Sequence, residues 1–253
     1  MIILSIVLLV IIFLFGLLQV EELFSTIMGT EHEYTFEAEN YPAHDLNWYM
    51  AIAFCNKLSL NQQIEPYYTV KDSQGNTIDF ETLEYSSIPT SSENTWTVTE
   101  NNNSGYRLPT EMEWEFAARG GDPDSDVWKY AFPGTDNSDK TKSINNIKGD
   151  SNLDNYAYYD DSESANVNED TTYEVGQKQP NTLSLYDMAG NVREWCNNEY
   201  YNESYKSYRG GSYYDYAYQC CVSYRSRELP HVTNSGSSSN AKYGFRLCRT
   251  INN

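Results

Sequence analysis

The stretch LYDMAGNVREW, residues 185–195, places two acidic side chains on either side of a turn and ends in a tryptophan. Asp187 and Glu194 lie within eight residues of each other, with Gly190 and Asn191 between them. Two carboxylates and the carbonyls of the intervening turn can supply several oxygen ligands at the distances that Ca²⁺ requires. The stretch therefore predicts either a calcium site or a hydrogen-bonded turn that precedes a buried Trp195.

Three segments on the N-terminal side have the spacing of amphipathic helices. Residues 20–28 place apolar side chains at i, i+3, i+4, i+7 and i+8 before Gly29, and residues 48–58 carry an apolar stripe that includes Trp48. The third helix begins at Thr110, which together with Glu113 has the pattern of a capping box, and ends at the glycines 120–121. These apolar stripes are typical of helices that pack against a core.

The segments between and after these helices are rich in turns. Residues 67–70 and 95–98 are short β-prone pieces, separated by turn residues. Residues 149–176 contain eight acids and no Lys or Arg, which predicts a solvated loop or, alternatively, a source of oxygen ligands for a hard cation. Because no repeat or linker divides this part of the chain, residues 20–253 are predicted to form a single domain.

Five segments in the same order resemble the sulfatase-modifying factor family, whose founding member is the formylglycine-generating enzyme. They are residues 48–59, 106–121, 185–195, 209–212 (RGGS) and 244–247 (GFRL). The resemblance implies an α+β fold, the variant of the C-type lectin fold found in formylglycine-generating enzymes, with little regular secondary structure. Family members usually carry strands before the first helix, whereas this chain has an apolar run there.

The apolar run covers residues 1–20 and is predicted to form an N-terminal hydrophobic helix. Residues 1–19 are interpreted as a signal peptide or an uncleaved membrane anchor, and a misplaced start of the sequence is a third alternative. Both leading interpretations place the domain outside the cytoplasm, as a membrane-anchored or secreted protein. The cysteine count is five, so in that compartment at least one thiol is free or paired between chains.

The composition of the 253-residue chain excludes several classes of protein. Its 36 acids and 17 bases give a net charge of −19, which argues against binding to nucleic acid and to anionic membrane surfaces. Aromatic residues make up 15% of the chain, so it can bury enough apolar area to fold.

The resemblance implies a copper(I) oxidase that converts a sulfatase cysteine to formylglycine with two cysteines after the Gly-Gly-Ser turn. Here Cys220, with Ser212 nearby, matches the second cysteine, but Asp215 occupies the position of the first. A hard carboxylate is a poor replacement for a thiolate toward Cu(I). The chain is therefore predicted to lack copper and oxidase activity, and the alternatives are an oxidase that uses Cys220 with an unconventional partner or a truncated, degenerate paralogue.

The same resemblance implies a structural calcium ion at the stretch quoted first. The matching positions are the side chains of Asp187 and Glu194 and the backbone carbonyls of Gly190 and Val192. All four positions match, with aspartate at 187 in place of the more usual asparagine.

Tyrosine is concentrated near the C-terminus, with nine of the 23 tyrosines between residues 200 and 224. Tyrosine combines a broad apolar face with a polar tip, which suits binding surfaces, although alternate tyrosines also pack in irregular β structure. In relatives of this fold the residues after the Gly-Gly-Ser turn form the ligand face. A protein, peptide or glycan ligand is therefore predicted to bind Tyr213, Tyr214, Asp215, Tyr216 and Tyr218.

Overall fold

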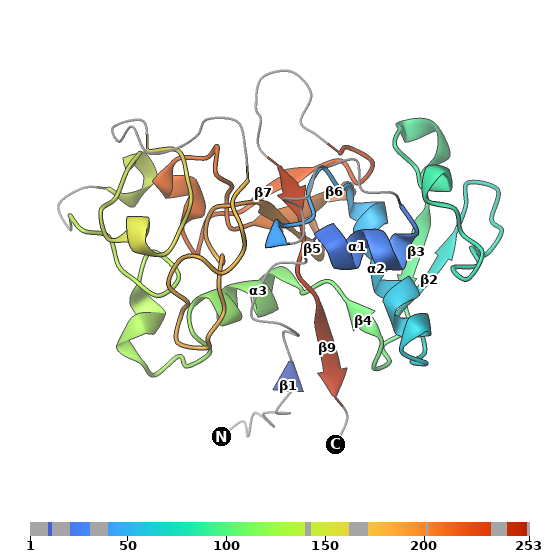
Figure 1. Ribbon diagram of the computed structural model, residues 1–253, viewed down its shortest axis with the longest axis horizontal. Coiled ribbons are helices and arrows are strands. Elements are labelled where there is room, and N and C mark those ends of the chain that lie inside the picture. Colours follow the sequence, from blue (N-terminus) through green and yellow to red (C-terminus); the bar gives the residue numbers. More distant parts are fainter. Residues whose placement is uncertain are drawn as a thin grey trace.

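The computed structural model describes residues 10–11, 21–30, 40–139, 143–161, 172–200, 202–233 and 242–251 (Figure 1). Its helices are α1 (Glu21–Met28), α2 (Trp48–Asn61) and α3 (Glu111–Ala118), with short 3₁₀ turns between them. The strands are β1 (Val10–Ile11), β2 (Tyr68–Lys71), β3 (Thr97–Glu100), β4 (Tyr106–Arg107), β5 (Arg193–Tyr200), β6 (Asn202–Arg209), β7 (Ser226–Glu228), β8 (Tyr243–Gly244) and β9 (Cys248–Ile251). This mixture of helices, short strands and long loops agrees with the predicted α+β class.

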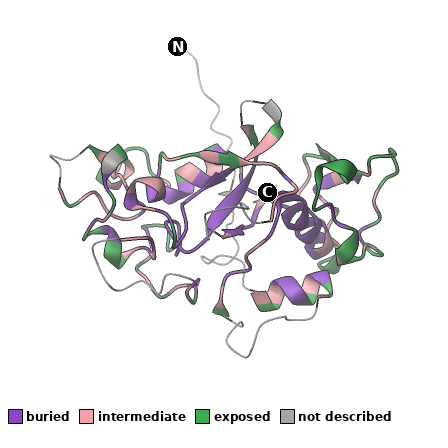
Figure 2. Ribbon diagram, turned by 90° about the horizontal axis from the view of Figure 1, so that it is seen from above, coloured by how far each residue is buried: buried purple, intermediate pink, exposed green. Residues whose placement is uncertain are grey.

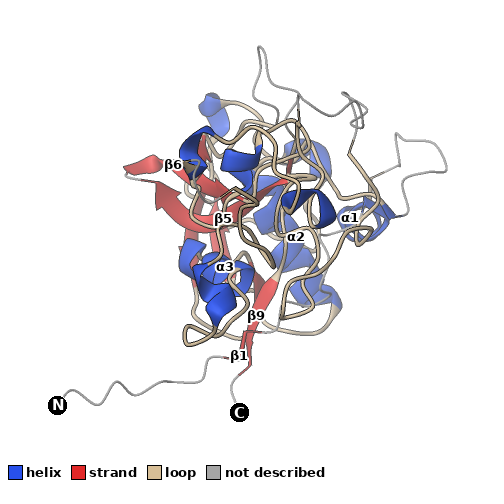
Figure 3. Cartoon of the chain, turned by 90° about the vertical axis from the view of Figure 1, so that its left-hand side faces the viewer, coloured by secondary structure: helices blue, strands red, loops and turns tan. Residues whose placement is uncertain are grey.

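The strands form three small sheets. Their orders are β1-β9-β4, β2-β3 and β7-β6-β5-β8. In the largest sheet β5 runs antiparallel to β6 and parallel to β8, and β6 runs antiparallel to β7. Loops make up much of the half that lies to the left in Figure 1 and faces the viewer in Figure 3. The candidate site lies where these loops meet β5 and β6.

The three helices and the two β-prone pieces predicted between residues 20 and 121 are confirmed, with small changes in their bounds. Helix α2 begins after Asn47, whose side chain accepts a hydrogen bond from the backbone N–H of Met50 at 2.9 Å. Helix α3 has the predicted capping box at Thr110 and Glu113. The predicted strand pieces become β2 and β3, which pair antiparallel.

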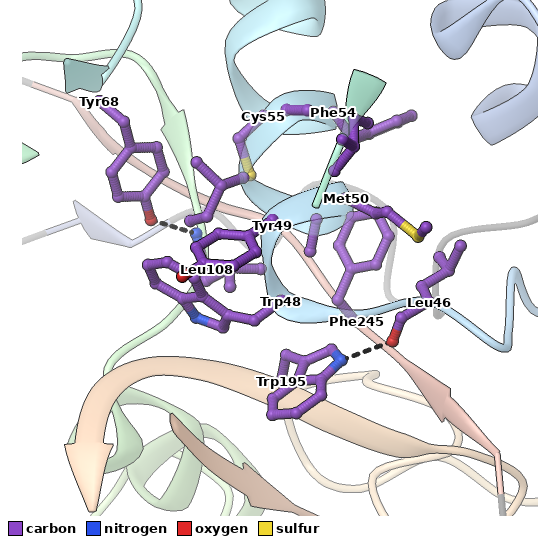
Figure 4. Packing of buried hydrophobic residues seen from close by; sticks show 14 of the residues in the cluster. Leu46, Trp48, Tyr49, Met50, Phe54, Cys55, Tyr68, Leu108, Trp195 and Phe245 are labelled. Atoms are coloured by element: carbon purple, nitrogen blue, oxygen red, sulfur yellow. Dashed lines mark hydrogen bonds between the residues drawn. The ribbon is translucent and has the colours of Figure 1, made fainter. Parts of the chain in front are cut away.

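Helix α2 occupies the centre of the main core, which explains its weakly amphipathic character. Eleven of its 14 residues are buried, and buried ribbon is concentrated in the middle of the molecule in Figure 2. Phe54 stacks on Phe24 of α1 with ring centroids 5.5 Å apart. Trp195 of β5 donates from its indole N–H to the Leu46 carbonyl at 2.8 Å, so the sheet is tied to the loop before α2 (Figure 4).

The predicted N-terminal hydrophobic helix is not confirmed. Val10 and Ile11, the described residues within that run, form β1, which pairs with Thr250 and Ile251 of β9. β-Branched residues suit a pleated strand, and pairing satisfies the backbone groups along that edge of β9. The rest of residues 1–20 lies outside the described residues, and no helix in the described part of the chain is long and apolar enough to cross a membrane.

Glu113 in α3 has two partners whose effect on stability depends on pH. Its carboxylate accepts hydrogen bonds from Arg107 at 2.7 and 2.8 Å and from the Thr110 N–H at 2.8 Å. Although burial would raise it, the pKa of Glu113 is held below its usual range by Arg107 and Thr110. The paired, ionised form belongs to the folded state, so its stabilisation is complete above the unfolded-state pKa of about 4.3 and is lost as the pH falls through the lower folded-state pKa.

We therefore expect Glu113→Gln to be less stable than the parent protein at pH 7, and the difference to shrink as the pH is lowered below about 4. Urea unfolding measured from pH 7 to pH 3 checks this result. The exposed Glu81→Gln is the matched control, because it removes the same charge without an ion pair. A stability difference that stays constant across this range contradicts the assignment.

Candidate functional site

Asp215, at the position of the family's first cysteine, is a buried partner of Arg193. The two side chains form a bidentate pair, with Arg193 Nη2 2.5 Å from Oδ1 and Nε 2.7 Å from Oδ2. Asp215 also accepts from the Ser212 N–H at 2.9 Å, from Ser212 Oγ at 2.8 Å and from Gln219 Nε2 at 2.9 Å. Because five donors surround the carboxylate, Asp215 is engaged inside the protein.

Two tight turns bring the two halves of this pair together. Gly190 and Gly211 have φ of +72° and +71°, the left-handed region that favours glycine. A Cβ at Gly190 would lie 2.0 Å from the Tyr158 carbonyl oxygen, so only glycine fits there. Backbone hydrogen bonds from Gly190 to Gly210 and from Tyr213 to Asn191 then hold the two turns side by side.

Cys220 lies beneath the second turn and is fully buried. A Cβ at Gly211 would lie 2.7 Å from its sulfur, which shows how closely the backbone covers the thiol. Burial raises the pKa of Cys220 well above its usual value, and the negative charge of Asp215 adds to the shift. Burial likewise raises the pKa of its neighbour Cys221 to about 12. The thiolate, which is the nucleophile and metal ligand, is therefore disfavoured at Cys220.

The position that supplies the first of the two thiols of the family's copper site is held here by Asp215. All five cysteines lie in described segments, and each is a buried, free thiol. Asp215 lies close enough for its charge to raise the pKa of the Cys220 thiol, and its hard oxygens are already occupied by nitrogen and hydroxyl donors. A two-coordinate Cu(I) site needs two soft ligands, so these residues do not fit copper.

Asp187 and Glu194, the residues predicted to supply side-chain ligands to calcium, both contact Arg246: Glu194 through its carboxylate and Asp187 through its backbone carbonyl. Glu194 is fully buried and accepts from Arg246 Nη2 at 2.6 Å, Arg246 Nε at 2.5 Å and Trp114 Nε1 at 2.6 Å. Arg246 Nη2 also donates to the Asp187 carbonyl at 3.3 Å. Burial raises the pKa of Asp187, and the nearby charge of Glu194 adds to the shift.

These residues offer oxygen ligands and a charge that suit a hard cation, but both Glu194 oxygens are already engaged by Arg246 and Trp114, so a cation would have to displace those donors. The predicted ligands are all oxygens, and Asp187, Glu194 and Arg246 together carry one uncompensated negative charge. Asp187 Oδ2 accepts the Gly176 N–H at 2.7 Å. Among the described residues no group of three or more His, Cys, Asp or Glu side chains could hold a metal, so a calcium ion here depends on the carbonyls of Gly190 and Val192.

The five predicted ligand-binding residues separate by exposure. Tyr213 and Asp215 are 1% and 3% exposed and lie beneath the surface, because the turn folds them onto residues 190–193. Tyr214 is 37% exposed, and Tyr216 and Tyr218 are half-buried with ring centroids 6.3 Å apart. Lys148 lies over the Tyr216 ring at 4.9 Å. Ligand contact therefore stays a prediction for Tyr214, Tyr216 and Tyr218, whose side chains reach the surface.

Arg193 and Arg246 are the important residues that the sequence analysis missed. Both lie within the quoted segments, and each neutralises a buried carboxylate. Asp215 at the position of a family cysteine could have indicated such a partner, since a buried aspartate requires a cation nearby. Pairing across 22 and 52 positions is, however, fixed only by the fold.

Two paired turns, one directly before β5 and one directly after β6, with a Gly-Gly-Ser segment in the second, define the class of formylglycine-generating-enzyme-like domains. The chain belongs to the sulfatase-modifying factor enzyme 1-like domain family, whose sequence profile matches residues 21–251.

Two curated relatives and one solved structure resemble this chain. The chaperone protein LppX of Paenibacillus barcinonensis is 36% identical over 162 residues, 64% of this chain and 53% of LppX. The inactive C-alpha-formylglycine-generating enzyme 2 of Bos taurus is 29% identical over 157 residues, 56% of this chain and 43% of the relative. This chain thus spans about half the length of these curated relatives. The solved structure of Treponema denticola variable protein 1 superposes with a TM-score of 0.71 at 32% identity, over 92% of this chain and 82% of that protein.

Proposed function

We propose that this chain is a non-catalytic member of the family that binds a ligand through the exposed Tyr214 and the half-buried Tyr216 and Tyr218. The observation that carries the proposal is the buried Asp215–Arg193 pair, which stands where an oxidase needs a thiolate. Support comes from a relative named as an inactive enzyme and from another named as a chaperone, a class that acts on proteins. A protein or peptide is therefore favoured over a glycan as the ligand.

The location and the partners belong to the same proposal. The apolar composition of residues 1–19 supports a secreted or membrane-anchored protein that works outside the cytoplasm, whereas the pairing of Val10 and Ile11 with β9 does not add to that support. The charge of −19 supports a ligand other than nucleic acid.

The catalytic alternative is tested with a peptide that contains the Cys-x-Pro-x-Arg motif of sulfatases. We expect no formylglycine by mass spectrometry after incubation of the purified protein with the peptide, copper, a reductant and oxygen. Formation of formylglycine that stops in the Cys220→Ser variant would establish the oxidase instead.

The binding face is tested with peptides selected from a displayed random library against the purified protein. We expect the triple variant with Tyr214, Tyr216 and Tyr218 changed to serine to lose at least tenfold in affinity, because each aromatic contact contributes roughly 1 kcal/mol or more. Tyr130→Ser is the matched control, since Tyr130 is a half-buried tyrosine on a different loop. Selected peptides that bind the triple variant and the parent protein equally would contradict the proposed face.

The proposed calcium ion would be held by the side chains of Asp187 and Glu194 and the carbonyls of Gly190 and Val192. It would supply positive charge that offsets the buried carboxylates. A ligand that binds only the folded state raises stability, so the melting temperature is expected to be higher in 1 mM Ca²⁺ than in excess chelator, by several degrees at about 100 times Kd. Equal melting temperatures would exclude a stabilising ion. A cooperative transition in either condition would also remove the alternative of a degenerate paralogue without a stable fold.

A further inference from the structure

The face of the large sheet that packs against α3 carries a row of arginines. Ser207 of β6 lies opposite Arg227 of β7, and Ser207 Oγ donates to Glu111 of α3 at 2.6 Å. Opposite residues in paired strands share a face, and Arg225 lies two positions before Arg227, so both arginines lie on the face toward α3. Arg225 reaches Glu111 with Nε at 2.9 Å and Nη2 at 2.5 Å.

Tyrosine rings separate and orient the two outer arginines. The Arg225 guanidinium carbon lies 4.5 Å from the centre of the Tyr200 ring, and that of Arg227 lies 5.2 Å from the same ring and 4.8 Å from the ring of Tyr205. Contact with an aromatic face holds the planar guanidinium while its N–H edge stays free to donate. Among the described residues, exposed Arg227 has no carboxylate or hydrogen-bond partner.

The balance of charge on this face is opposite to that of the whole protein. Arg119, Arg209, Arg225 and Arg227 are offset by Glu111 and Glu115, which already serve the first three of these arginines. Arg209 is 2% exposed, and its Nε is a buried donor without a partner. Glu199, the third acid near the adjoining pocket, pairs with Lys206 at 3.5 Å, so the excess of positive charge lies at the arginines, in a chain whose net charge is −19.

A pocket of about 330 Å³ adjoins this row of arginines. Arg209 and Arg225 line it together with Ser223 and with Met112, whose side chain is 83% exposed. Among the described strands β7 lies at an edge of its sheet, the kind of edge to which an extended chain can add. A ligand that matches these features is an extended peptide with an acidic side chain for the arginines and a neighbouring apolar side chain for the pocket at Met112.

We propose that this surface, formed by Arg225, Arg227, Tyr200, Tyr205 and the pocket at Met112, binds an acidic peptide segment of a partner protein. A carboxylate of the segment accepts a forked hydrogen bond from Arg227, and a neighbouring side chain contacts Met112 in the pocket. A carboxylate brings one negative charge to Arg227 and a phosphoryl dianion brings two, so Glu111, Glu115 and Glu199, which also line the pocket, repel a carboxylate less. This inference does not depend on ligand binding at Tyr214, Tyr216 and Tyr218.

Fluorescence anisotropy with labelled hexaglutamate tests the proposal on the full chain in about 0.15 M salt, where the long-range repulsion from the protein's net charge is screened. We expect binding to hexaglutamate and none to hexaserine, and about a tenfold loss in Arg227→Gln. Arg227→Lys keeps the charge but not the fork and is expected to lose part of the affinity. Lys71→Gln removes the same charge from an exposed position on β2 and should bind like the parent protein.

Three outcomes would overturn the proposal. They are the absence of binding to hexaglutamate, equal losses in Arg227→Gln and Lys71→Gln, and tighter binding of a phosphoserine peptide than of hexaglutamate. Arg227 is exposed, so its variants should keep the parent melting temperature, which is measured alongside. The triple tyrosine variant is expected to bind hexaglutamate normally, which separates this surface from the one under Proposed function.

Discussion

Replacing Asp215 with alanine is expected to lower the free energy of unfolding by about 3–5 kcal/mol, because Arg193 would remain buried without its counter-charge. The same change leaves the Ser212 N–H, Ser212 Oγ and Gln219 without their acceptor. Urea unfolding followed by tryptophan fluorescence measures the loss. If the side chain were instead held ready for a ligand, its removal would have a small effect on stability.

Two further variants make this measurement specific. Asp124→Ala removes an exposed aspartate and is expected to change stability by less than about 0.5 kcal/mol. Replacing Arg193 and Asp215 together, by methionine and leucine, is expected to be less destabilising than the sum of the single changes, because no unpaired charge remains. Additive losses in this double-mutant cycle would contradict the ion pair.

Replacing Glu194 with glutamine is expected to cost a similar 3–5 kcal/mol. Glu194 and Arg246 are 0% and 1% exposed, and the carboxylate also accepts from Trp114. Glutamine keeps the size of the side chain but removes the charge that balances Arg246. Thermal and urea unfolding in excess calcium chelator measure the contribution of the ion pair without any contribution from a bound cation.

The exposed Glu93→Gln serves as the control for this change, since it removes the same charge at the surface. Repeating the comparison with Ca²⁺ present separates two roles of Glu194. If Glu194 also binds calcium, the variant loses more stability with calcium than with chelator. A loss below about 1 kcal/mol in chelator would contradict the structural role of the Glu194–Arg246 pair.

The sequence could predict local features because short-range chemistry determines them. The capping box at Thr110, the helix after Asn47 and the paired strands β2 and β3 follow from spacing and turn residues. The ordered motifs were enough to predict the family and its α+β fold. The position of Asp187 close to Glu194 also follows from one continuous turn.

Features that depend on distant contacts could not be predicted in this way. The burial of Tyr213 and Asp215 results from backbone bonds between the turns at 190–193 and 210–215, and alternation along the chain does not show it. The strand at Val10–Ile11 depends on the edge that β9 offers, whereas the apolar composition of the run favoured a helix. The roles of the arginines also depend on the fold. The sheet places Arg193 and Arg246 beside their carboxylate partners and brings Arg225 and Arg227 onto one face.

Titration with Cu(I) in competition with a coloured chelator tests the central claim, the absence of the oxidase's metal site, most directly. Because Asp215 is committed to Arg193 and Cys220 is a buried neutral thiol, we predict that the native protein removes no copper from the chelator. The Cys220→Ser variant should then give the same titration curve as the parent protein. Uptake of one equivalent of Cu(I) by the parent protein, lost in Cys220→Ser, would contradict this account of the site.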